Sequence, residues 1–280
     1  MERCGCVILN YNDAQTVVRL VEKISTYKNL DEILIVDNCS NDNSIEILSK
    51  VKTQKITLLR ALKNGGYGAG NNIGIKYAKK NLHCQYVVVC NPDIDFSDKL
   101  IGKMLQVYKL NHRIGVVSAI QLDPNHVPIN DFAWKIPNSK DIAFMTTRLG
   151  NRISNLHYPL ERINAHLVND VECVPGAMLM FDVDAFTSIG GYDEEMFLYC
   201  EEMTIAYKLR EQGYRTILLG NEYYIHEHSV SINKTITSKK EQIKLIFNNR
   251  LLFMKKYLNA SPFWIIVTKL LQNRRLFKMK

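Results

Sequence analysis

Short apolar segments alternate with segments of helical spacing over residues 1–120. The apolar segments are rich in Val and Ile, as buried parallel strands are, and they cover residues 5–9, 32–36, 55–59, 86–90 and 114–119. Between them, apolar side chains recur every three to four positions at 14–26, 43–51, 71–80 and 98–111. This alternation predicts right-handed crossover units and therefore an α/β fold, with a mostly parallel, Rossmann-like sheet flanked by helices.

Polar side chains follow the predicted strands at the points where these end. They are Asn10, Tyr11 and Asn12 after the first strand, Asp37 and Asn38 after the second, and Asn91 and Asp93 after the fourth. In a doubly wound sheet the ligand site lies outside the carboxyl ends of the strands, so we expect these residues at a cleft. An acid that ends a buried strand, such as Asp37, needs a partner, and a ligand base or ribose hydroxyl is a natural one.

The fourth strand runs directly into an acidic segment. Pro92 interrupts strand pairing and so presents Asp93 beyond the edge of the sheet. A carboxylate in that place suits Mg²⁺ or Mn²⁺, which proteins bind through one or two carboxylates together with substrate phosphates. The structural alternative is a loop acid, with Asp95 as a turn former.

A glycine-rich segment at 63–72 precedes the third predicted helix. Its four glycines and three asparagines would let a ligand approach the backbone and meet amide donors at the start of the helix. The segment does not fit the dinucleotide fingerprint, because Asn71 replaces the third glycine. It is not a Walker A loop either, since Asn71 and Asn72 stand where Lys and Ser or Thr are required. A purely structural turn remains an equal alternative.

The second half of the chain is less regular in pattern. Residues 121–170 contain several prolines and read as irregular, and residues 174–181 read as a strand. The next predicted helix carries Glu201 and Glu202 in its first turn and ends near Gly213. The helix dipole favours acids in a first turn, so a purely structural role for the two glutamates stays open.

Charge is distributed unevenly along the chain. The net charge is +8, yet residues 234–280 contain twelve Lys or Arg and one acid, which leaves a balance of −3 for residues 1–233. Pro262 separates two amphipathic helical pieces in this tail. We expect adsorption to an anionic membrane surface through the anchors Phe263, Trp264 and Phe277; a packed helical appendage is the alternative. No groove-reading motif supports a nucleic-acid partner.

Cysteine usage and hydropathy bear on location. The seven cysteines are odd in number and form no CxxC pair, which predicts reduced thiols and buried structural roles for Cys4 and Cys6 rather than zinc. The first strand begins without a leader of secretory type, and no apolar run approaches the ~20 residues of a membrane-spanning helix. We therefore expect a cytoplasmic protein, soluble or peripheral on the inner face of the plasma membrane.

Several segments together resemble one enzyme family. "VILNYN", "IVDNCSND", "NGGYGAGNNIGI", "CNPDID", "VPGAMLMFDVDAFTSIGGYDEEMFLYCEE" and "HEHSVS" follow one another, from residue 4 to about residue 230, as in family 2 glycosyltransferases of GT-A fold. The chain is most similar to the bacterial rhamnosyltransferase-like branch. This resemblance implies a nucleotide-sugar-binding half at 1–120 and an acceptor-binding, catalytic half of the same domain at 121–233, followed by a basic helical extension at 234–280.

The resemblance also implies roles for individual residues. Asn91 and Asp93 stand at the two ends of the family's DxD motif, whose last acid binds the Mg²⁺ or Mn²⁺ on the diphosphate; Asn in the first place is a known variant. Of His226 and His228, we favour His226 as a contact of the ion or diphosphate. The residues implied to bind the nucleotide are Asn10, Asn12, Asp37, Asn64, Gly66, Asn71 and Asn91.

The catalytic segment departs from the family pattern. The family has Glu-Asp-x-Asp, with the Asp after the Glu as base, whereas this chain has Glu201, Glu202, Met203 and Thr204. Glu202 therefore replaces the base, and Glu201 is the substitute candidate. The implied reaction is a metal-dependent, inverting transfer from a nucleoside-diphosphate sugar, with rhamnose among the candidates, to a glycan or lipid-linked acceptor in bacterial surface polysaccharide or capsule synthesis.

Two other functions compete with this interpretation. A nucleotidyltransferase of similar fold would carry glycine and a basic residue after its first strand, and "NYNDAQTV" has neither. A non-catalytic, sugar-nucleotide-binding scaffold is suggested by the altered acids at positions 202 and 204. Turnover of a donor sugar nucleotide would distinguish an enzyme from a scaffold.

Overall fold

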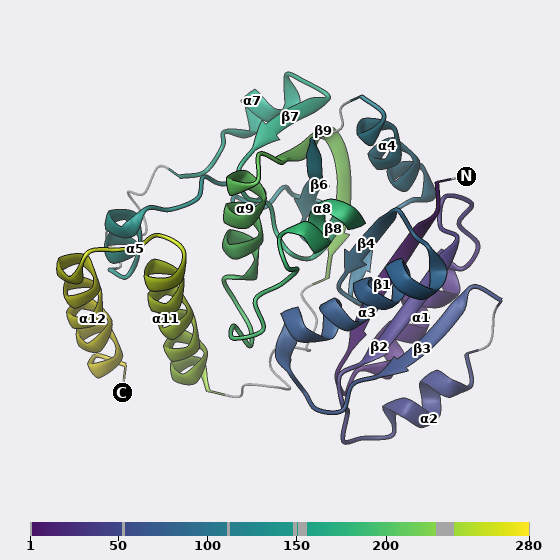
Figure 1. Cartoon of the computed structure of the whole chain (residues 1–280), viewed down its shortest axis with the longest axis horizontal. Coiled ribbons are helices and arrows are strands. Elements are labelled where there is room, and N and C mark those ends of the chain that lie inside the picture. Colours follow the sequence, from purple (N-terminus) through teal and green to yellow (C-terminus); the bar gives the residue numbers. More distant parts are fainter. Residues whose placement is uncertain are drawn as a thin grey trace.

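The structure is a computed structural model that describes residues 2–51, 54–110, 113–147, 150, 156–227 and 238–279 (Figure 1). The strands are β1 (Cys4–Asn10), β2 (Glu32–Asp37), β3 (Ile56–Arg60), β4 (Tyr86–Cys90), β5 (Ile94–Asp95), β6 (Ile114–Leu122), β7 (Val168–Val171), β8 (Met178–Asp182) and β9 (Arg215–His226). The helices are α1 (Ala14–Ile24), α2 (Ser44–Ser49), α3 (Gly66–Leu82), α4 (Asp98–Tyr108), α5 (Ser139–Met145), α7 (Leu160–Asn164), α8 (Val183–Ser188), α9 (Glu201–Glu211), α11 (Lys239–Lys256) and α12 (Pro262–Phe277).

The strands form one mixed sheet in the order β3-β2-β1-β4-β8-β6-β9-β5, with β7 added along β9. β1, β2, β3 and β4 pair in parallel, and β6 is parallel to β9. β8 lies antiparallel between β4 and β6. The predicted α/β fold with a sheet flanked by helices is therefore confirmed, with four parallel and four antiparallel strand pairs. The strands and helices expected in residues 1–120 are confirmed as well, apart from the start of α3.

Helices cover both faces of the sheet. Val17, Val21 and Ile24 recur along α1 at three- and four-residue spacing and, together with α4, bury one face. α3, α8 and α9 bury the other face. Because side chains alternate along a strand, neighbours such as Val7 and Ile8 of β1 enter opposite layers.

Helix α3 begins five residues before the predicted helix at 71–80. Residues 66–72 of the glycine-rich segment thus belong to the helix, and only residues 63–65 precede it. Gly66 has a φ of +86°, and a Cβ there would lie 2.0 Å from the Phe197 backbone oxygen. A Cβ at Gly70 would lie 2.3 Å from Cδ1 of Leu9. The glycines allow α3 to pack closely against β1 and the segment around Phe197, a tertiary requirement that a turn pattern does not reveal.

We expect Gly66→Ala to lower the free energy of unfolding by about 2–5 kcal/mol, because it adds both left-handed backbone strain and a steric overlap. Gly190→Ala is the matched control: Gly190 has a φ of +76° but nothing within 4 Å of the added Cβ, so about 1–2 kcal/mol is expected. Denaturant unfolding measures both values. Equal losses for the two variants would contradict the packing role of Gly66.

Residues 121–170 are not irregular throughout. They contain α5, α7 and part of β7, and Trp134 makes isolated antiparallel bridges to His157 and Cys173. These elements are short, so their side chains show too few repeats for a period to be recognised.

The tail helices pack on the second half of the chain. Phe253 and Met254 of α11 join a buried cluster with Ile142 of α5 and with Met203 and Ala206 of α9. Figure 1 shows α11 and α12 at the opposite end of the molecule from β3. The expected boundary at 233/234 lies outside the described residues. In the described part of the chain, no helix is both long and apolar enough to cross a membrane.

Candidate active site

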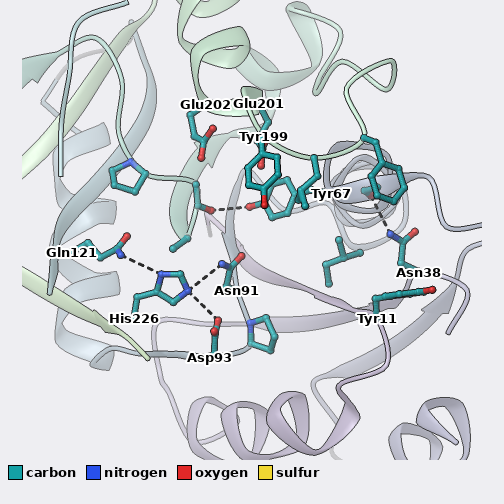
Figure 2. Close-up of a pocket in the computed structure, with 18 of the residues that line it drawn as sticks. Tyr11, Asn38, Tyr67, Asn91, Asp93, Gln121, Tyr199, Glu201, Glu202 and His226 are labelled. Carbon is teal, nitrogen blue, oxygen red and sulfur yellow. Dashed lines mark hydrogen bonds and ion pairs between the residues drawn. The ribbon is translucent and has the colours of Figure 1, made fainter. Parts of the chain in front are cut away.

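A cleft of about 620 Å³ opens at the carboxyl ends of β1 and β4 (Figure 2). β8 runs antiparallel to β4, and its first residue, Met178, pairs with Cys90 at the end of β4. The segment that leads into β8 therefore crosses the carboxyl end of β4 and forms part of the cleft wall. The Asn91 N–H donates to the Ala177 oxygen over 2.9 Å at this crossing. Gly176 and Ala177 therefore line the cleft beside Asn91.

Asp93, Asn91 and His226 converge on one side of the cleft. His226 Nε2 lies 3.2 Å from Asp93 Oδ1 and 3.4 Å from Asn91 Nδ2. His226 is the last residue of β9, where it pairs with Ile94 of β5. This pairing brings His226 beside Asp93. His228 lies outside the described residues.

Two buried side chains that sequence reasoning missed orient the His226 ring. Gln121 Nε2 lies 3.2 Å from His226 Nδ1, and the Tyr224 hydroxyl donates to Gln121 Oε1 over 3.0 Å. Outer contacts of this kind set the direction of an imidazole ligand. No local signal could identify them, because Gln121 and Tyr224 belong to different strands that are adjacent only in the folded sheet.

The geometry around Asp93 fits a hard divalent cation. The described residues contain no group of three or more His, Cys, Asp and Glu that could hold a metal by themselves. Mg²⁺ and similar ions commonly take one or two protein carboxylates and complete their shell with water and substrate phosphates. Neighbouring ligands of an octahedral ion at 2.0–2.1 Å are about 3 Å apart, which is close to the spacing of Asp93 Oδ1 and His226 Nε2.

Glu201 and Glu202 lie across the cleft from Asp93, as Figure 2 shows. They open α9 directly after Tyr199 and Cys200, which have positive φ values of 72° and 69°. This left-handed pair reverses the chain and directs the first turn of α9 toward the cleft. A Cβ on Gly176 would lie 3.2 Å from Glu202 Oε1, so the backbone at Gly176 is close to the carboxylate.

The two carboxyls differ in how their charge is stabilised. Burial raises the pKa of both Glu201 and Glu202. The Glu202 charge raises the pKa of Glu201 further, and Oε2 of Glu201 has no hydrogen-bond partner in the described part of the chain. Backbone hydrogen bonds from Glu202 itself and from Gly176 oppose the rise in the Glu202 pKa, whereas only the backbone of Glu201 itself opposes the rise in the Glu201 pKa. The pKa of Glu201 is therefore raised further than that of Glu202.

The residues expected to bind the nucleotide divide into two groups. Asn64, Gly66 and Asn91 line the cleft. Asn10 and Asp37 instead bind each other, with Asn10 Nδ2 donating to Asp37 Oδ1 over 2.8 Å, and both are fully buried. The Asp37 carboxylate thus has an internal partner.

Asn12 and Asn71 also lie outside the cleft wall. The Asn12 side chain accepts from the Asn41 N–H over 3.0 Å, and Asn71 Nδ2 donates to the Tyr67 backbone oxygen over 3.0 Å. Both contacts stabilise the backbone around the cleft, and neither side chain lines the cleft.

Tyr11, Asp13 and Asn38, which are next to Asn10, Asn12 and Asp37 in the sequence, line the cleft instead. Neighbouring side chains at a strand end point in different directions, so one of each pair is turned inward. Asn38, next to Asp37, donates from Nδ2 to Asn64 Oδ1 over 2.9 Å. Tyr11 and Asn38 line the cleft, as expected from their positions at strand ends. Cleft-lining side chains that the sequence did not point to include Asp13, Tyr67, Gln121, Trp134 and Tyr199.

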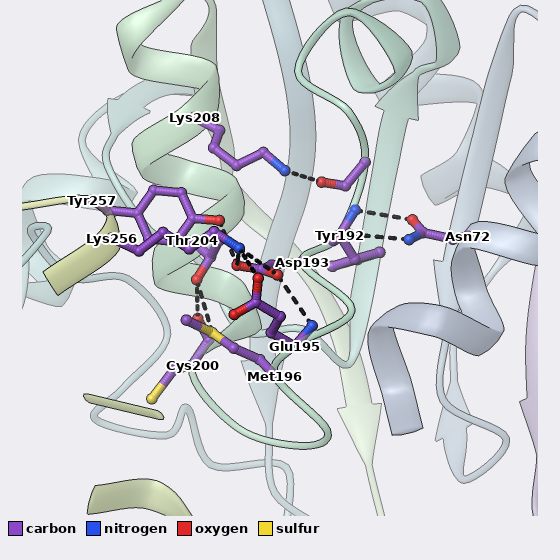
Figure 3. A network of polar contacts seen from close by, with 11 residues as sticks. Asn72, Tyr192, Asp193, Glu195, Met196, Cys200, Thr204, Lys208, Lys256 and Tyr257 are labelled. Atoms are coloured by element: carbon purple, nitrogen blue, oxygen red, sulfur yellow. Dashed lines mark hydrogen bonds and ion pairs between the residues drawn. The ribbon is translucent and has the colours of Figure 1, made fainter. Parts of the chain in front are cut away.

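A polar network braces the segment that leads into α9 (Figure 3). Asn72 of α3 accepts from the Tyr192 N–H over 2.9 Å and donates to the Tyr192 oxygen over 3.0 Å. Lys256 and Tyr257, at the end of α11, reach Asp193 over 2.9 Å and 2.6 Å. The segment before the glutamates is thus held from α3 on one side and from α11 on the other.

Solved structures with this fold are GT-A glycosyltransferases. GalNAc-T7 with UDP, GalNAc and Mn²⁺ superposes with a TM-score of 0.61 at 15% identity, over 82% of this chain and 45% of that one. A mannosyltransferase from Pyrobaculum calidifontis in complex with GDP-Man and Mn²⁺ gives a TM-score of 0.59 at 14% identity, over 96% and 73%. At these identities the likeness establishes the GT-A fold.

The family follows from the sequence match. The model of glycosyl transferase family 2 matches residues 6–188, and the chain belongs to this family of glycosyltransferases. Its relatives include the low-salt glycan biosynthesis hexosyltransferase Agl10 of Haloferax volcanii, 25% identical over 93% of this chain and 78% of that protein. The rhamnosyltransferase WbbL of Escherichia coli K12 is 24% identical over 92% and 95%. The resemblance inferred from the motifs is confirmed.

Proposed function

We propose that this glycosyltransferase moves a sugar, with rhamnose among the candidates, from a nucleoside diphosphate to a hydroxyl of a glycan or lipid-linked acceptor, with inversion at the anomeric carbon. The observation that carries the proposal is the placement of Asp93 and His226 across one cleft from Glu201 and Glu202. Residues 1–120 would bind the nucleotide sugar and residues 121–233 the acceptor. The similarity to the rhamnosyltransferase WbbL supports rhamnose as a candidate sugar, and we place the reaction in bacterial surface polysaccharide or capsule synthesis.

On the donor side, Asn38, Asn64 and Gly66 would meet the nucleoside, because they line the cleft beside the end of β2. Asn10 and Asp37 would shape this wall from behind through their buried contact. Asp93 and His226 would hold Mg²⁺ or Mn²⁺, which supplies positive charge for the departing diphosphate. Gln121 and Tyr224 would keep His226 directed at that position.

On the acceptor side, Glu202 would act as general base. It would take the proton of the acceptor hydroxyl while the hydroxyl oxygen forms a bond to C1 of the sugar and the C1–oxygen bond to the diphosphate breaks. Attack from the face opposite the leaving group inverts the anomeric centre. The protonated Glu201 would keep a second negative charge away from the reacting centre.

A thermal-shift panel of nucleoside diphosphates, with and without Mn²⁺, tests the donor site. A ligand that binds only the native state raises the melting temperature, so we expect one or more diphosphates to raise it and Mn²⁺ to enlarge the rise. The matched nucleosides lack the diphosphate and should show no gain from Mn²⁺. If no diphosphate raises the melting temperature, with or without Mn²⁺, the proposed donor site is wrong.

The competing functions predict different products. A nucleotidyltransferase would release pyrophosphate from a nucleoside triphosphate, and the family assignment argues against this reaction. A scaffold would bind a sugar nucleotide without releasing the nucleoside diphosphate from it. Release of that product by the purified chain would therefore exclude the scaffold.

We further propose a cytoplasmic enzyme at the inner face of the plasma membrane. The concentration of twelve cationic residues in 234–280 supports this location, since anionic headgroups attract such segments.

A further inference from the structure

Helix α12 has the reverse of the usual polarity of a surface helix. Its polar residues Thr268 and Gln272 are buried against the protein, and Gln272 Nε2 donates to the Phe247 oxygen of α11 over 3.1 Å. Four of its exposed side chains are large and apolar: Phe263 is 64%, Ile266 58%, Leu270 63% and Phe277 87% exposed. Figure 1 shows α12 at the edge of the molecule, with α11 and α5 beside it.

The four exposed apolar residues form one stripe, named here the α12 stripe. At about 100° of rotation and 1.5 Å of rise per residue, they fall within an arc of about 60° and span about 21 Å along the helix. The same rotation sets Lys269 on one border of the stripe and Arg274 and Lys278 on the other. α12 contains no Asp or Glu, and within the described residues none of these three cations forms an ion pair.

We propose that the α12 stripe is a docking surface for an anionic membrane, with the helix lying in the plane of the interface. The apolar side chains would enter the boundary between headgroups and acyl chains, and the bordering cations would meet lipid phosphates. α12 is held from its inner side, where Arg275 donates to the Thr146 oxygen over 2.9 Å, so its outer side is available for the lipid.

The cations at the borders of the α12 stripe favour an anionic membrane over a second copy of the chain as the partner of this surface. Pairing two α12 stripes would bring Lys269, Arg274 and Lys278 of each copy close to the same cations of the other, without acids on the helix to compensate. An anionic lipid surface neutralises both borders at once. The stripe occupies only one arc of a 16-residue helix, so the geometry fits adsorption rather than insertion across a bilayer.

The structure also revises the expected anchors. Phe263 and Phe277 are exposed as expected, but Trp264 is half-buried in the cluster formed with α11. Ile266 and Leu270 take its place on the outer face. Gln242 of α11 lines the cleft, so the tail connects the docked surface with the active site. If the proposed function holds, the acceptor would be carried by a lipid of the same membrane.

Co-sedimentation of the full chain with vesicles tests the docking surface without any turnover. We expect binding to vesicles that contain an anionic phospholipid, weaker binding to neutral phosphatidylcholine vesicles, and loss of binding with added salt. Ile266→Ser with Leu270→Ser should weaken binding at least about tenfold. Lys269→Gln and Arg274→Gln should each weaken it about fivefold.

Matched controls lie far from the tail. Leu62 is fully exposed, and Lys80 is exposed at the end of α3, so Leu62→Ser and Lys80→Gln should bind vesicles as the wild type does. Melting temperatures of all variants should stay within a few degrees, since only exposed side chains change. Wild-type levels of vesicle binding by the Ile266/Leu270 variant would overturn the proposal. So would a concentration-dependent dimer, seen by analytical ultracentrifugation, that this variant abolishes.

This experiment separates the inference from the proposed function. Vesicle binding needs neither donor nor acceptor, so it can succeed in a chain that fails to turn over a sugar nucleotide. Conversely, if the chain is active but does not bind anionic vesicles, the glycosyltransferase assignment stands and the proposed docking surface is wrong.

Discussion

Glu202→Gln is expected to lower kcat by about 10²- to 10⁴-fold while leaving donor binding nearly unchanged, because the amide keeps the size of the side chain but cannot accept a proton. Backbone hydrogen bonds from Glu202 itself and from Gly176 stabilise the charge of Glu202. Release of nucleoside diphosphate in the presence of an acceptor measures the rate, and the thermal shift with nucleoside diphosphate checks that the donor still binds.

Glu201→Gln is the matched control for this prediction. Because burial and the Glu202 charge raise the pKa of Glu201, its carboxyl should already be neutral when Glu202 is ionised, and a neutral amide replaces it closely. We therefore expect this variant to keep most of the activity. The opposite result, a large loss for Glu201→Gln and a small one for Glu202→Gln, would identify Glu201 as the base.

The pH profile gives a third readout of the same pair. A base works only when unprotonated, so activity must fall as the pH drops through the pKa of Glu202. Since burial raises that pKa, the acid limb should lie above the ordinary Glu value of about 4.3. A limb at or below that value would contradict a buried base.

Asp93→Asn is expected to weaken Mn²⁺-dependent binding of a nucleoside diphosphate by more than about 100-fold, because it removes the only negatively charged group that we assign to the ion. The readout is the rise in melting temperature produced by the diphosphate with Mn²⁺, which should fall to the value seen with a chelator. Donor turnover should disappear in parallel.

Asp95→Asn provides the control for this second prediction. Asp95 lies two residues along the chain and carries the same charge, but its half-exposed side chain pairs with Lys23 instead of facing His226. It should keep both the Mn²⁺-dependent thermal shift and the turnover. Equal effects of the two substitutions would mean that general charge, rather than a bound ion at Asp93, governs donor binding.

Much of this fold was predictable from local pattern. Val- and Ile-rich segments such as 86–90 are too apolar to lie anywhere but in the middle of a sheet, and alternation with helical spacing requires parallel crossovers. Parallel strands end on the same edge, so the amino-acid pattern alone was enough to expect Asn91 and Asp93 at a cleft there. The ordered motifs added the family, which the family match then confirmed.

The details of the site were harder to predict, because they depend on contacts between distant segments. His226 lies beside Asp93 only because β5 pairs with β9, and Gly176 reaches Glu202 only because β8 enters antiparallel beside β4. Asp37 was expected to face a ligand, yet Asn10 from the adjacent strand satisfies its carboxylate. The pattern of polar residues at a strand end does not predict which of two adjacent side chains points into the cleft.

The sequence by itself determined the layered α/β architecture, the edge of the sheet that carries the site and the cationic character of the tail, since each depends on composition and short-range period. Only the tertiary structure decided the first turn of α3, the partners of Asp93 and Glu202 and the outward face of α12. α12 has apolar residues on more than one side, so its pattern did not reveal which side the protein buries. The packing of α11 and α5 against α12, in which Thr268 and Gln272 are buried, sets which side faces the protein.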